Sequence, residues 1–329
     1  MTEVKIPSKF FQNWKEILQG LYPGKPNFTE DKWPKDLDDK VLIITGGNAG
    51  IGFEVVKKLF ENTNIKIYIF ARNEETTKSK INELIKENKT KSNQLNFIRV
   101  DLADLTTIKP AVDEFLKLEK RLDIIIHNAG VMMPRKGEFT KQNFELQLGV
   151  NCIAPFLLQH YLNPILISTS NLSKSTSCRI VWVASTAHFW APEHGLYFPD
   201  PNFKTTNEPS NLTIYSQSKA ISIIIAKQWS LHHKNSSVIS VALCPGYLKT
   251  GLSRNLNKIE NFFGDLITHD SSLGAYTEIY AALSPDVENG DYIISFGKKG
   301  NCRTDLNDVE NSEKVWNYLE EQIEPYISK

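Results

Sequence analysis

The stretch Thr45-Gly46-Gly47-Asn48-Ala49-Gly50-Ile51-Gly52 follows a short β-branched run, residues 41–45, and precedes a helical pattern over residues 51–61. Its glycines suit the three places where such a turn tolerates no Cβ: the chain reversal, the backbone approach to a pyrophosphate, and the contact of helix with strand. The helix beginning near Ile51 would offer free N–H groups and a positive dipole end to phosphates. A turn that merely connects two elements is the alternative. The strand before it and the helix after it favour dinucleotide binding.

The remaining pattern predicts an α/β protein with a doubly wound (Rossmann), mostly parallel, seven-stranded sheet and helices on both faces. Apolar runs without polar alternation, separated by amphipathic helices, are typical of buried parallel strands. The predicted strands are 41–45, 65–70, 95–100, 122–127, 179–184, 238–243 and 291–295. The predicted helices are 51–61, 74–87, 105–118, 144–166 with interruptions at Pro155 and Pro164, 215–233 and 272–283. We expect residues 1–38 to be an N-terminal extension with an amphipathic helix, and residues 39–329 to be a single catalytic domain with a C-terminal helix.

Composition excludes several classes of function. The 329 residues contain 38 Lys and Arg against 38 Asp and Glu, so no basic field favours nucleic acid or an anionic membrane. The four cysteines show no metal-ligand or Cys-x-x-Cys spacing, so we expect no metal site and a reduced, cytoplasmic protein. We expect neither a signal peptide nor a transmembrane helix.

Several residues are placed for the adenosine half of a cofactor. Arg72 comes two residues after the second strand's Phe70, where an arginine suits a ribose 2′-phosphate and an acidic residue would suit a 2′-hydroxyl. This favours NADP(H) over NAD(H), the alternative being that Arg72 is an ordinary surface residue. Asp101 and Leu102, after the third strand, are expected beside the adenine, where Asp101 could also cap the next helix. Residues 128–130, Asn-Ala-Gly, close the fourth strand at the edge of the sheet where ligands bind.

A second motif, Tyr215-Ser216-Gln217-Ser218-Lys219, can move a proton. Tyr215 and Lys219 are four residues apart on a predicted helix, so their side chains share one face. A free tyrosine has a pKa of about 10, and a nearby ammonium favours the phenolate. Ser185 ends the fifth strand and could donate a hydrogen bond to a substrate oxygen. A surface i,i+4 pair is the alternative, and Ser185 with the glycine turn argues against it.

These motifs together resemble the short-chain dehydrogenase/reductase family. The matching residues are Thr45-Gly46-x-x-x-Gly50-x-Gly52, Asn128-Ala129-Gly130, Asn151, Ser185, Tyr215-x-x-x-Lys219 and Pro245-Gly246. They span about residues 39–300 in the family's order. The stretches 128–133, 179–181 and 215–220 are similar to the retinol-dehydrogenase-like branch.

The resemblance implies roles for single residues. Tyr215 would be the proton donor or acceptor, Lys219 its pKa modifier and a ribose ligand, and Ser185 the group that polarises the substrate carbonyl. Asn151 would hold a water linking Lys219 to solvent. The implied cofactor-binding set is Thr45, Gly46, Asn48, Gly50, Ile51, Gly52, Arg72, Asp101, Leu102, Asn128, Ala129, Gly130, Tyr215, Lys219, Pro245, Gly246, Leu248 and Thr250. The activity implied is hydride transfer between NADP(H) and a carbonyl compound or alcohol.

The interval between Ser185 and Tyr215 is longer than in minimal family members and rich in aromatic residues. We expect it to form a substrate wall for an apolar carbonyl or alcohol, with His188, Trp190 and Tyr247 as substrate residues. Packing is the alternative role of His188. Two other functions stay open: a non-catalytic dinucleotide-binding sensor or scaffold on the same fold, and an NAD-dependent steroid or retinoid dehydrogenase.

The chain ends carry apolar stripes at helical spacing. Within residues 10–21 the stripe is Phe10, Phe11, Trp14, Ile17, Leu18 and Leu21. Such a helix either packs on the domain or a neighbouring subunit, or lies peripherally on a membrane or lipid-droplet surface. Trp316, Leu319 and Ile323 predict a C-terminal helix that covers the domain. Apolar positions on the 215–233 helix, which often forms a dimer interface in the family, favour a homodimer.

Overall fold

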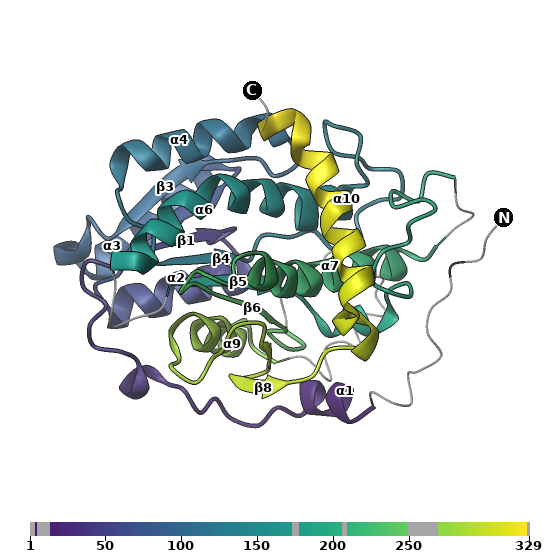
Figure 1. Cartoon of the computed structure of the whole chain (residues 1–329). Helices are drawn as coiled ribbons and strands as arrows, with labels where there is room; N and C mark the ends of the chain where they lie inside the picture. Colours follow the sequence, from purple (N-terminus) through teal and green to yellow (C-terminus); the bar gives the residue numbers. More distant parts are fainter. Residues whose placement is uncertain (1–3, 5–13, 173–177, 206–208, 249–268, 328–329) are drawn as a thin grey trace.

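The computed structural model describes residues 4, 14–172, 178–205, 209–248 and 269–327, and its centre is a twisted sheet (Figure 1). Within these residues the sheet has eight strands in the order β3-β2-β1-β4-β5-β6-β7-β8. The strands are β1 (Val41–Thr45), β2 (Lys66–Ala71), β3 (Leu95–Arg99), β4 (Ile124–His127), β5 (Arg179–Val183), β6 (Ile239–Leu243), β7 (Tyr292–Ile294) and β8 (Lys298–Gly300). All pairs from β3 to β7 are parallel. The predicted doubly wound fold is confirmed.

The predicted count of seven strands is wrong. The eighth strand, β8, pairs antiparallel with β7, with Tyr292 opposite Gly300 and Ile294 opposite Lys298. Its sequence, Lys-Lys-Gly, has no apolar pattern because this strand lies at the edge of the sheet. Its pairing with β7 is therefore visible only in the folded chain.

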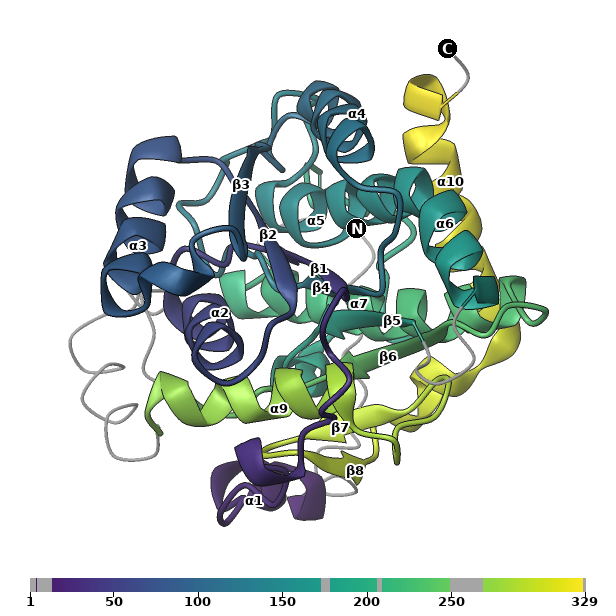
Figure 2. The same cartoon turned by 90° about the vertical axis from the view of Figure 1, so that its left-hand side faces the viewer.

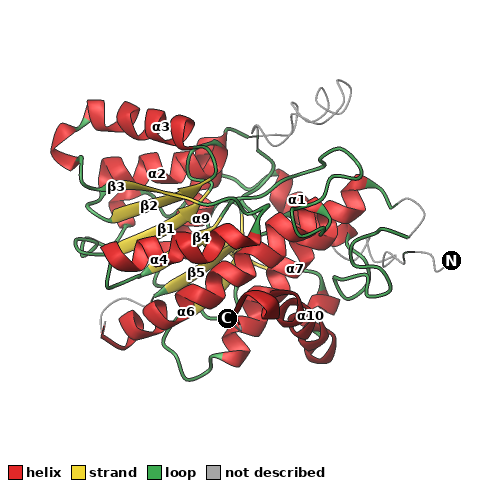
Figure 3. Cartoon of the chain, turned by 90° about the horizontal axis from the view of Figure 1, so that it is seen from above, coloured by secondary structure: helices red, strands yellow, loops and turns green. Residues whose placement is uncertain are grey.

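Helices cover both faces of the sheet (Figures 2 and 3). Among the described residues, the helices longer than one turn are α1 (Trp14–Leu21), α2 (Gly50–Asn62), α3 (Glu74–Glu87), α4 (Ile108–Leu118), α6 (Ala154–Leu172), α7 (Asn211–His232), α9 (Ser271–Leu283) and α10 (Val309–Ile327). Side chains of α2, α3 and α9 share one apolar core with the sheet, while those of α4, α6, α7 and α10 share the other. This sandwich brings the carboxyl ends of the parallel strands to one edge, where ligands bind in such folds.

The predicted 144–166 helix consists of three joined segments. The short helix α5 (Leu146–Leu148) runs into a π-helical turn, Gly149–Ile153, and then into α6, which continues past Pro164 to Leu172. The predicted interruption by prolines is therefore wrong, and the irregular turn precedes both of them. The stretch Leu146–Leu172 passes the length and composition criteria for a membrane span, and 67% of its most apolar window is buried inside the fold, as in a core helix.

The C-terminal helix α10 packs across α7 and α6, as the sequence predicted for a domain cover (Figure 1). The Trp316 ring of α10 meets the Phe156 ring edge-on, with 4.7 Å between the ring centroids. It also stacks on the His232 ring, with 4.5 Å between the centroids. Nearly all residues of α7 between Tyr215 and Trp229 are buried within the single chain. The apolar positions assigned from sequence to a dimer interface are therefore covered by the protein itself, and a homodimer stays a prediction.

The N-terminal helix α1 lies against the body near the ends of the strands (Figure 1). The carbonyl oxygen of Leu21, its last residue, accepts a hydrogen bond from His269 Nε2 at 3.2 Å. A Cβ at Gly20 would lie 3.3 Å from the Thr186 methyl group and 3.4 Å from the Tyr247 ring. Trp14 and Leu18 stay exposed, and Phe10 and Phe11 lie outside the described residues. One face of the helix thus packs on the domain, while contact with lipid stays a prediction.

Candidate active site

The glycine turn leaves the start of α2 open to a ligand. Gly46 and Gly50 have φ of +69° and +54°, in the left-handed region that glycine tolerates. Ala49, at the N-cap position of α2, provides no side-chain hydrogen bond to the first helical N–H groups. Buried or partly buried N–H groups need partners, and phosphate oxygens are suitable ones. The turn therefore fits a dinucleotide pyrophosphate, as the sequence predicted.

Asn128 fixes this turn to the end of β4. Its Nδ2 donates to the carbonyl oxygen of Thr45 at 2.8 Å, and the N–H of Ala129 donates to Thr45 Oγ1 at 2.9 Å. A Cβ on Gly52 would lie 2.4 Å from Asn128 Nδ2 and 2.8 Å from the Gly46 carbonyl oxygen. Only glycine at position 52 allows the helix to approach this closely.

The residues predicted beside the adenosine lie around the neighbouring strand ends. Arg72 follows β2 and is exposed, and Asn48 Nδ2 lies 3.3 Å from Thr76 Oγ1. Asp101 Oδ1 accepts a hydrogen bond from the N–H of Ala103 at 3.0 Å, so it orders its own turn. The helix-capping role considered for Asp101 belongs instead to the residue three positions on, Asp104, which caps the following 3₁₀ turn.

The side chain of Leu102 packs in the apolar core and is only 7% exposed. It differs in this from the polar and glycine residues predicted to line the cofactor site. If Leu102 contacts a cofactor, its backbone atoms would therefore make the contact.

Tyr215, Ser185 and Lys219 meet at the end of β5. The Ser185 side chain interacts with the Tyr215 hydroxyl, and Lys219 Nζ lies 5.7 Å from the centre of the Tyr215 ring. Burial raises the pKa of Tyr215 above its ordinary value, and the interaction with Ser185 opposes that rise. The phenol is therefore protonated at neutral pH and available as a proton donor.

Lys219 lies at the centre of the site. Its Nζ donates to the carbonyl oxygen of Val183 at 2.8 Å, and a Cβ on Gly130 would lie 3.6 Å from it. Burial lowers the pKa of Lys219 to about 8, so the ammonium still predominates at pH 7. A charge here can stabilise a tyrosinate that forms when Tyr215 gives up its proton.

Asn151 occupies the π-helical turn and faces the loop after β4. Its Oδ1 accepts from the N–H of Val131 at 2.8 Å, and its Nδ2 donates to the Val131 carbonyl oxygen at 3.0 Å and to Ser218 Oγ at 2.9 Å. The side chain is thus occupied in joining β4, α7 and the π turn. A water held by this residue could bind the second lone pair of Oδ1 or the backbone carbonyl oxygen.

The predicted substrate residues separate into two groups. Trp190 and Tyr247 are partly exposed, and Tyr247 interacts with the Thr186 side chain beside Ser185. His188 is fully buried, with Nδ1 2.7 Å from the Ser185 carbonyl oxygen and Nε2 3.2 Å from the Arg303 backbone nitrogen. The prediction of His188 as a substrate contact is wrong, because both ring nitrogens are engaged inside the protein. Its alternative packing role agrees with the structure.

The segment after β6 brings the expected nicotinamide neighbours to the same edge. Gly246 has φ +108°, and a Cβ there would lie 2.7 Å from Ser295 Oγ. Leu248 touches α9, since a Cβ on Gly274 would lie 2.1 Å from Leu248 Cδ1. Pro245 precedes Gly246 in this loop, and Thr250 lies outside the described residues.

Two features of the site region were not predicted from sequence. Glu278 on α9 is fully buried, neither carboxylate oxygen has a hydrogen-bond partner among the described residues, and burial raises its pKa to about 8. It interacts electrostatically with Lys219. A carboxylate within the apolar run 275–283 was the available signal. The other feature is the buried Arg303, which no local pattern marks.

Comparisons with known proteins agree with this geometry. Residues 40–197 match the family model described as short chain dehydrogenase. A short-chain dehydrogenase/reductase of Emericella nidulans, pkfC, is 36% identical over 299 residues, covering 89% of this chain and 95% of the relative. A short-chain dehydrogenase/reductase of Phomopsis amygdali is 33% identical over 334 residues, covering 96% of this chain and 99% of the relative.

Solved structures share the fold. A 3-ketoacyl-(acyl-carrier-protein) reductase from Brucella melitensis, complexed with NADH, has a TM-score of 0.61 at 21% identity, covering 80% of this chain and 98% of that one. The Pseudomonas aeruginosa RhlG/NADP complex has a TM-score of 0.62 at 18% identity, covering 83% of this chain and 98% of that one. The chain belongs to the short-chain dehydrogenase/reductase family and is an NAD(P)-dependent oxidoreductase. The predicted family is confirmed, while its retinol-dehydrogenase-like branch stays a prediction.

Proposed function

We propose that this protein is an NADP(H)-preferring oxidoreductase that interconverts an apolar carbonyl compound and its alcohol. The observation that carries the proposal is the convergence of Tyr215, Ser185 and Lys219 beside the glycine turn. When bound, the cofactor supplies a hydride to the carbonyl carbon or accepts one from the alcohol.

The three side chains divide the proton chemistry among them. Tyr215 donates its phenolic proton to the substrate oxygen, and its raised pKa keeps that proton in place until the oxygen becomes basic. Ser185 orients the same oxygen by hydrogen bonding. The Lys219 ammonium stabilises the tyrosinate that remains. Alcohol oxidation reverses these proton movements.

The preference for NADP(H) rests on Arg72. It is exposed directly after β2, next to the glycine turn, where a guanidinium can bind a 2′-phosphate through two hydrogen bonds. An acidic residue at this position would instead suit NAD(H).

The preference for an apolar substrate rests on the surroundings of Ser185. Trp190, Tyr247 and Val131 are all partly exposed near the site, and α1 packs against Tyr247 from outside. Aromatic and aliphatic surface of this kind favours a hydrophobic compound over a sugar or an acid.

A panel of aldehydes and ketones tests the proposal, with consumption of NADPH as the readout. Tyr215→Phe should lower kcat by about 10²- to 10⁴-fold, the usual contribution of general acid catalysis, with NADPH affinity nearly unchanged. If the wild type binds NADPH and reduces none of the panel, the chain is better described as a dinucleotide-binding sensor. Turnover with NADH alone on steroids or retinoids would instead favour the NAD-dependent alternative.

A further inference from the structure

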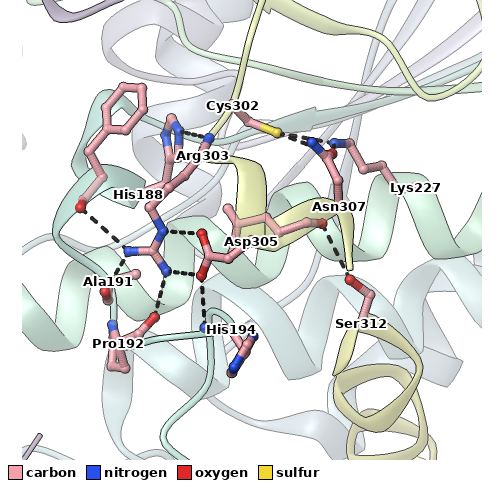
Figure 4. Close-up of polar contacts among 12 residues, drawn as sticks. His188, Ala191, Pro192, His194, Lys227, Cys302, Arg303, Asp305, Asn307 and Ser312 are labelled. Carbon is pink, nitrogen blue, oxygen red and sulfur yellow. Dashed lines mark hydrogen bonds and ion pairs between the residues drawn. The ribbon is translucent and has the colours of Figure 1, made fainter. Parts of the chain in front are cut away.

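Arg303 is a buried cation that binds one short segment of the chain (Figure 4). Its Nη1 donates to the carbonyl oxygen of Ala191 at 2.6 Å, and its Nη2 donates to that of Pro192 at 2.6 Å. Asp305 balances the charge through two hydrogen bonds, from Nε at 2.6 Å and from Nη2 at 2.8 Å. The guanidinium therefore fixes the end of the 3₁₀ helix Thr186–Trp190 to the C-terminal part of the chain.

His188 makes the second connection to this segment, through the Arg303 backbone nitrogen (Figure 4). Its hydrogen-bond partners determine its tautomer. The backbone N–H of Arg303 can only donate, so Nε2 of His188 must accept at 3.2 Å. The single ring proton therefore lies on Nδ1 and is donated to the Ser185 carbonyl oxygen at 2.7 Å. Burial lowers the pKa of His188 to about 3, so the ring stays neutral. The imidazole thus connects Arg303 to Ser185 directly.

Ser185 is the N-cap of the same 3₁₀ helix. Its Oγ accepts from the N–H of Ala187 at 3.1 Å, which leaves its hydroxyl proton for another acceptor. The side chain also interacts with the Tyr215 hydroxyl. His188 therefore holds the backbone of Ser185. The 3₁₀ helix that Arg303 binds holds the Ser185 side chain through the N–H of Ala187.

We propose that His188 and Arg303, supported by Asp305, are positioning residues that hold Ser185 in its orientation toward Tyr215 and the substrate oxygen. This inference rests on the proposed function, since it concerns the same proton-transfer site. A 3₁₀ helix has poorer internal hydrogen bonds than an α-helix, so external contacts matter more to its conformation. Small displacements of a catalytic group of about 1 Å can cost about 10²-fold in rate.

The test compares three variants. His188→Phe keeps a ring packed against Phe189 and Tyr292 but removes the ring's hydrogen bonds with Ser185, Arg303 and the Tyr292 hydroxyl. His188→Asn can still donate to the Ser185 carbonyl oxygen, because its amide nitrogen replaces Nδ1. Arg179→Lys is the matched control, since Arg179 is also a buried guanidinium that binds two carbonyl oxygens, at 3.0 Å each, but at the opposite end of β5. All three are assayed for kcat, for NADPH affinity by direct binding, and for Tm.

We expect His188→Phe to lower kcat by about 10- to 100-fold, with NADPH affinity changed less than twofold. His188→Asn should recover a large part of this loss, and Arg179→Lys should lower Tm without a comparable loss of kcat. A His188→Phe enzyme with wild-type kcat, or an Arg179→Lys enzyme equally impaired at equal Tm, would overturn the proposal. An inactive wild type would instead refute the proposed function.

A second measurement covers the case in which His188→Phe does not fold. Nitrogen NMR of histidine-labelled wild-type protein, assigned by comparison with His188→Asn, should show a protonated Nδ1 and an unprotonated Nε2 for His188. Arg303→Lys, which cannot reach the same set of carbonyl oxygens, should lower kcat as His188→Phe does. The opposite tautomer, or an Arg303→Lys enzyme with unchanged kcat, would each refute the inference.

Discussion

Lys219 Nζ donates a hydrogen bond to the carbonyl oxygen of Val183 at 2.8 Å, and this contact joins α7 to the last residue of β5. Two residues beyond Val183 is Ser185, and one helical turn before Lys219 is Tyr215. This hydrogen bond therefore helps to hold the helix that carries Tyr215 and Lys219 beside Ser185. The same lysine has a lowered pKa because it is buried.

The pH dependence of the reaction rate should reflect the protonation state of Lys219. Below pH 8 the Lys219 ammonium is protonated and supports proton donation by Tyr215, and above pH 8 that support is lost. In carbonyl reduction we expect kcat/KM for the carbonyl compound, which includes the proton-transfer step, to fall as pH rises through about 8. Lys219→Met should be slow at all pH values and lack this decline. A profile that stays flat to pH about 10, near the ordinary lysine value, would contradict the assignment.

Arg72 should determine cofactor choice. Charge-assisted hydrogen bonds are worth about 1.5–3 kcal/mol, so Arg72→Asp should weaken NADPH binding by about 10- to 100-fold. NADH binding should stay the same or improve, because aspartate can accept from the ribose hydroxyl groups. Lys86→Asp, which makes the same change of charge at an exposed position on α3, is the control. Equal NADPH dissociation constants for Arg72→Asp and wild type would remove Arg72 from the site.

Glu278 should make the protein less stable as pH rises. Its folded pKa of about 8 lies above the ordinary glutamate pKa of about 4.5, so between these values the folded state binds more protons than the unfolded state. The free energy of unfolding therefore decreases from pH 4.5 to 8, by at most about 1.4 kcal/mol per pH unit from this group. Glu278→Gln should flatten the slope measured by urea unfolding at pH 5 and pH 7.5. The exposed Glu87→Gln should not, and equal slopes for all three proteins would contradict this prediction.

Gly52 should tolerate no side chain. Alanine there would place its Cβ 2.4 Å from Asn128 Nδ2, which must then leave the Thr45 carbonyl oxygen. Overpacking of this kind costs about 1–3 kcal/mol, and we expect a lower Tm together with at least about tenfold weaker NADPH binding. Gly137→Ala serves as the control, because its Cβ would meet nothing within 4 Å and only the backbone strain of φ +81° would be added. NADPH affinity equal to wild type in Gly52→Ala would show that the turn adapts.

Much of the site could be predicted because its requirements are local. A turn that lacks Cβ atoms must be built from glycines in order along the chain, and a Tyr and a Lys must be four residues apart to share a helix face. Neighbouring residues, such as the strand before Gly46, favour these functional interpretations over their alternatives. These constraints act between residues that are close along the chain, so the sequence shows them without any information about distant segments.

The remaining features depend on contacts between distant segments, which periodicity does not record. The sequence predicts His188 as a substrate contact from its position near Ser185, but it does not show that Arg303, more than a hundred residues later, binds the ring. Strand β8 exists because β7 offers it an edge, and α7 is buried because α10 returns across it. Chain order and local geometry thus fix the cofactor turn and the catalytic helix. Packing of distant segments decides which buried polar groups support them, since burial and hydrogen-bond partners arise only when the chain is folded.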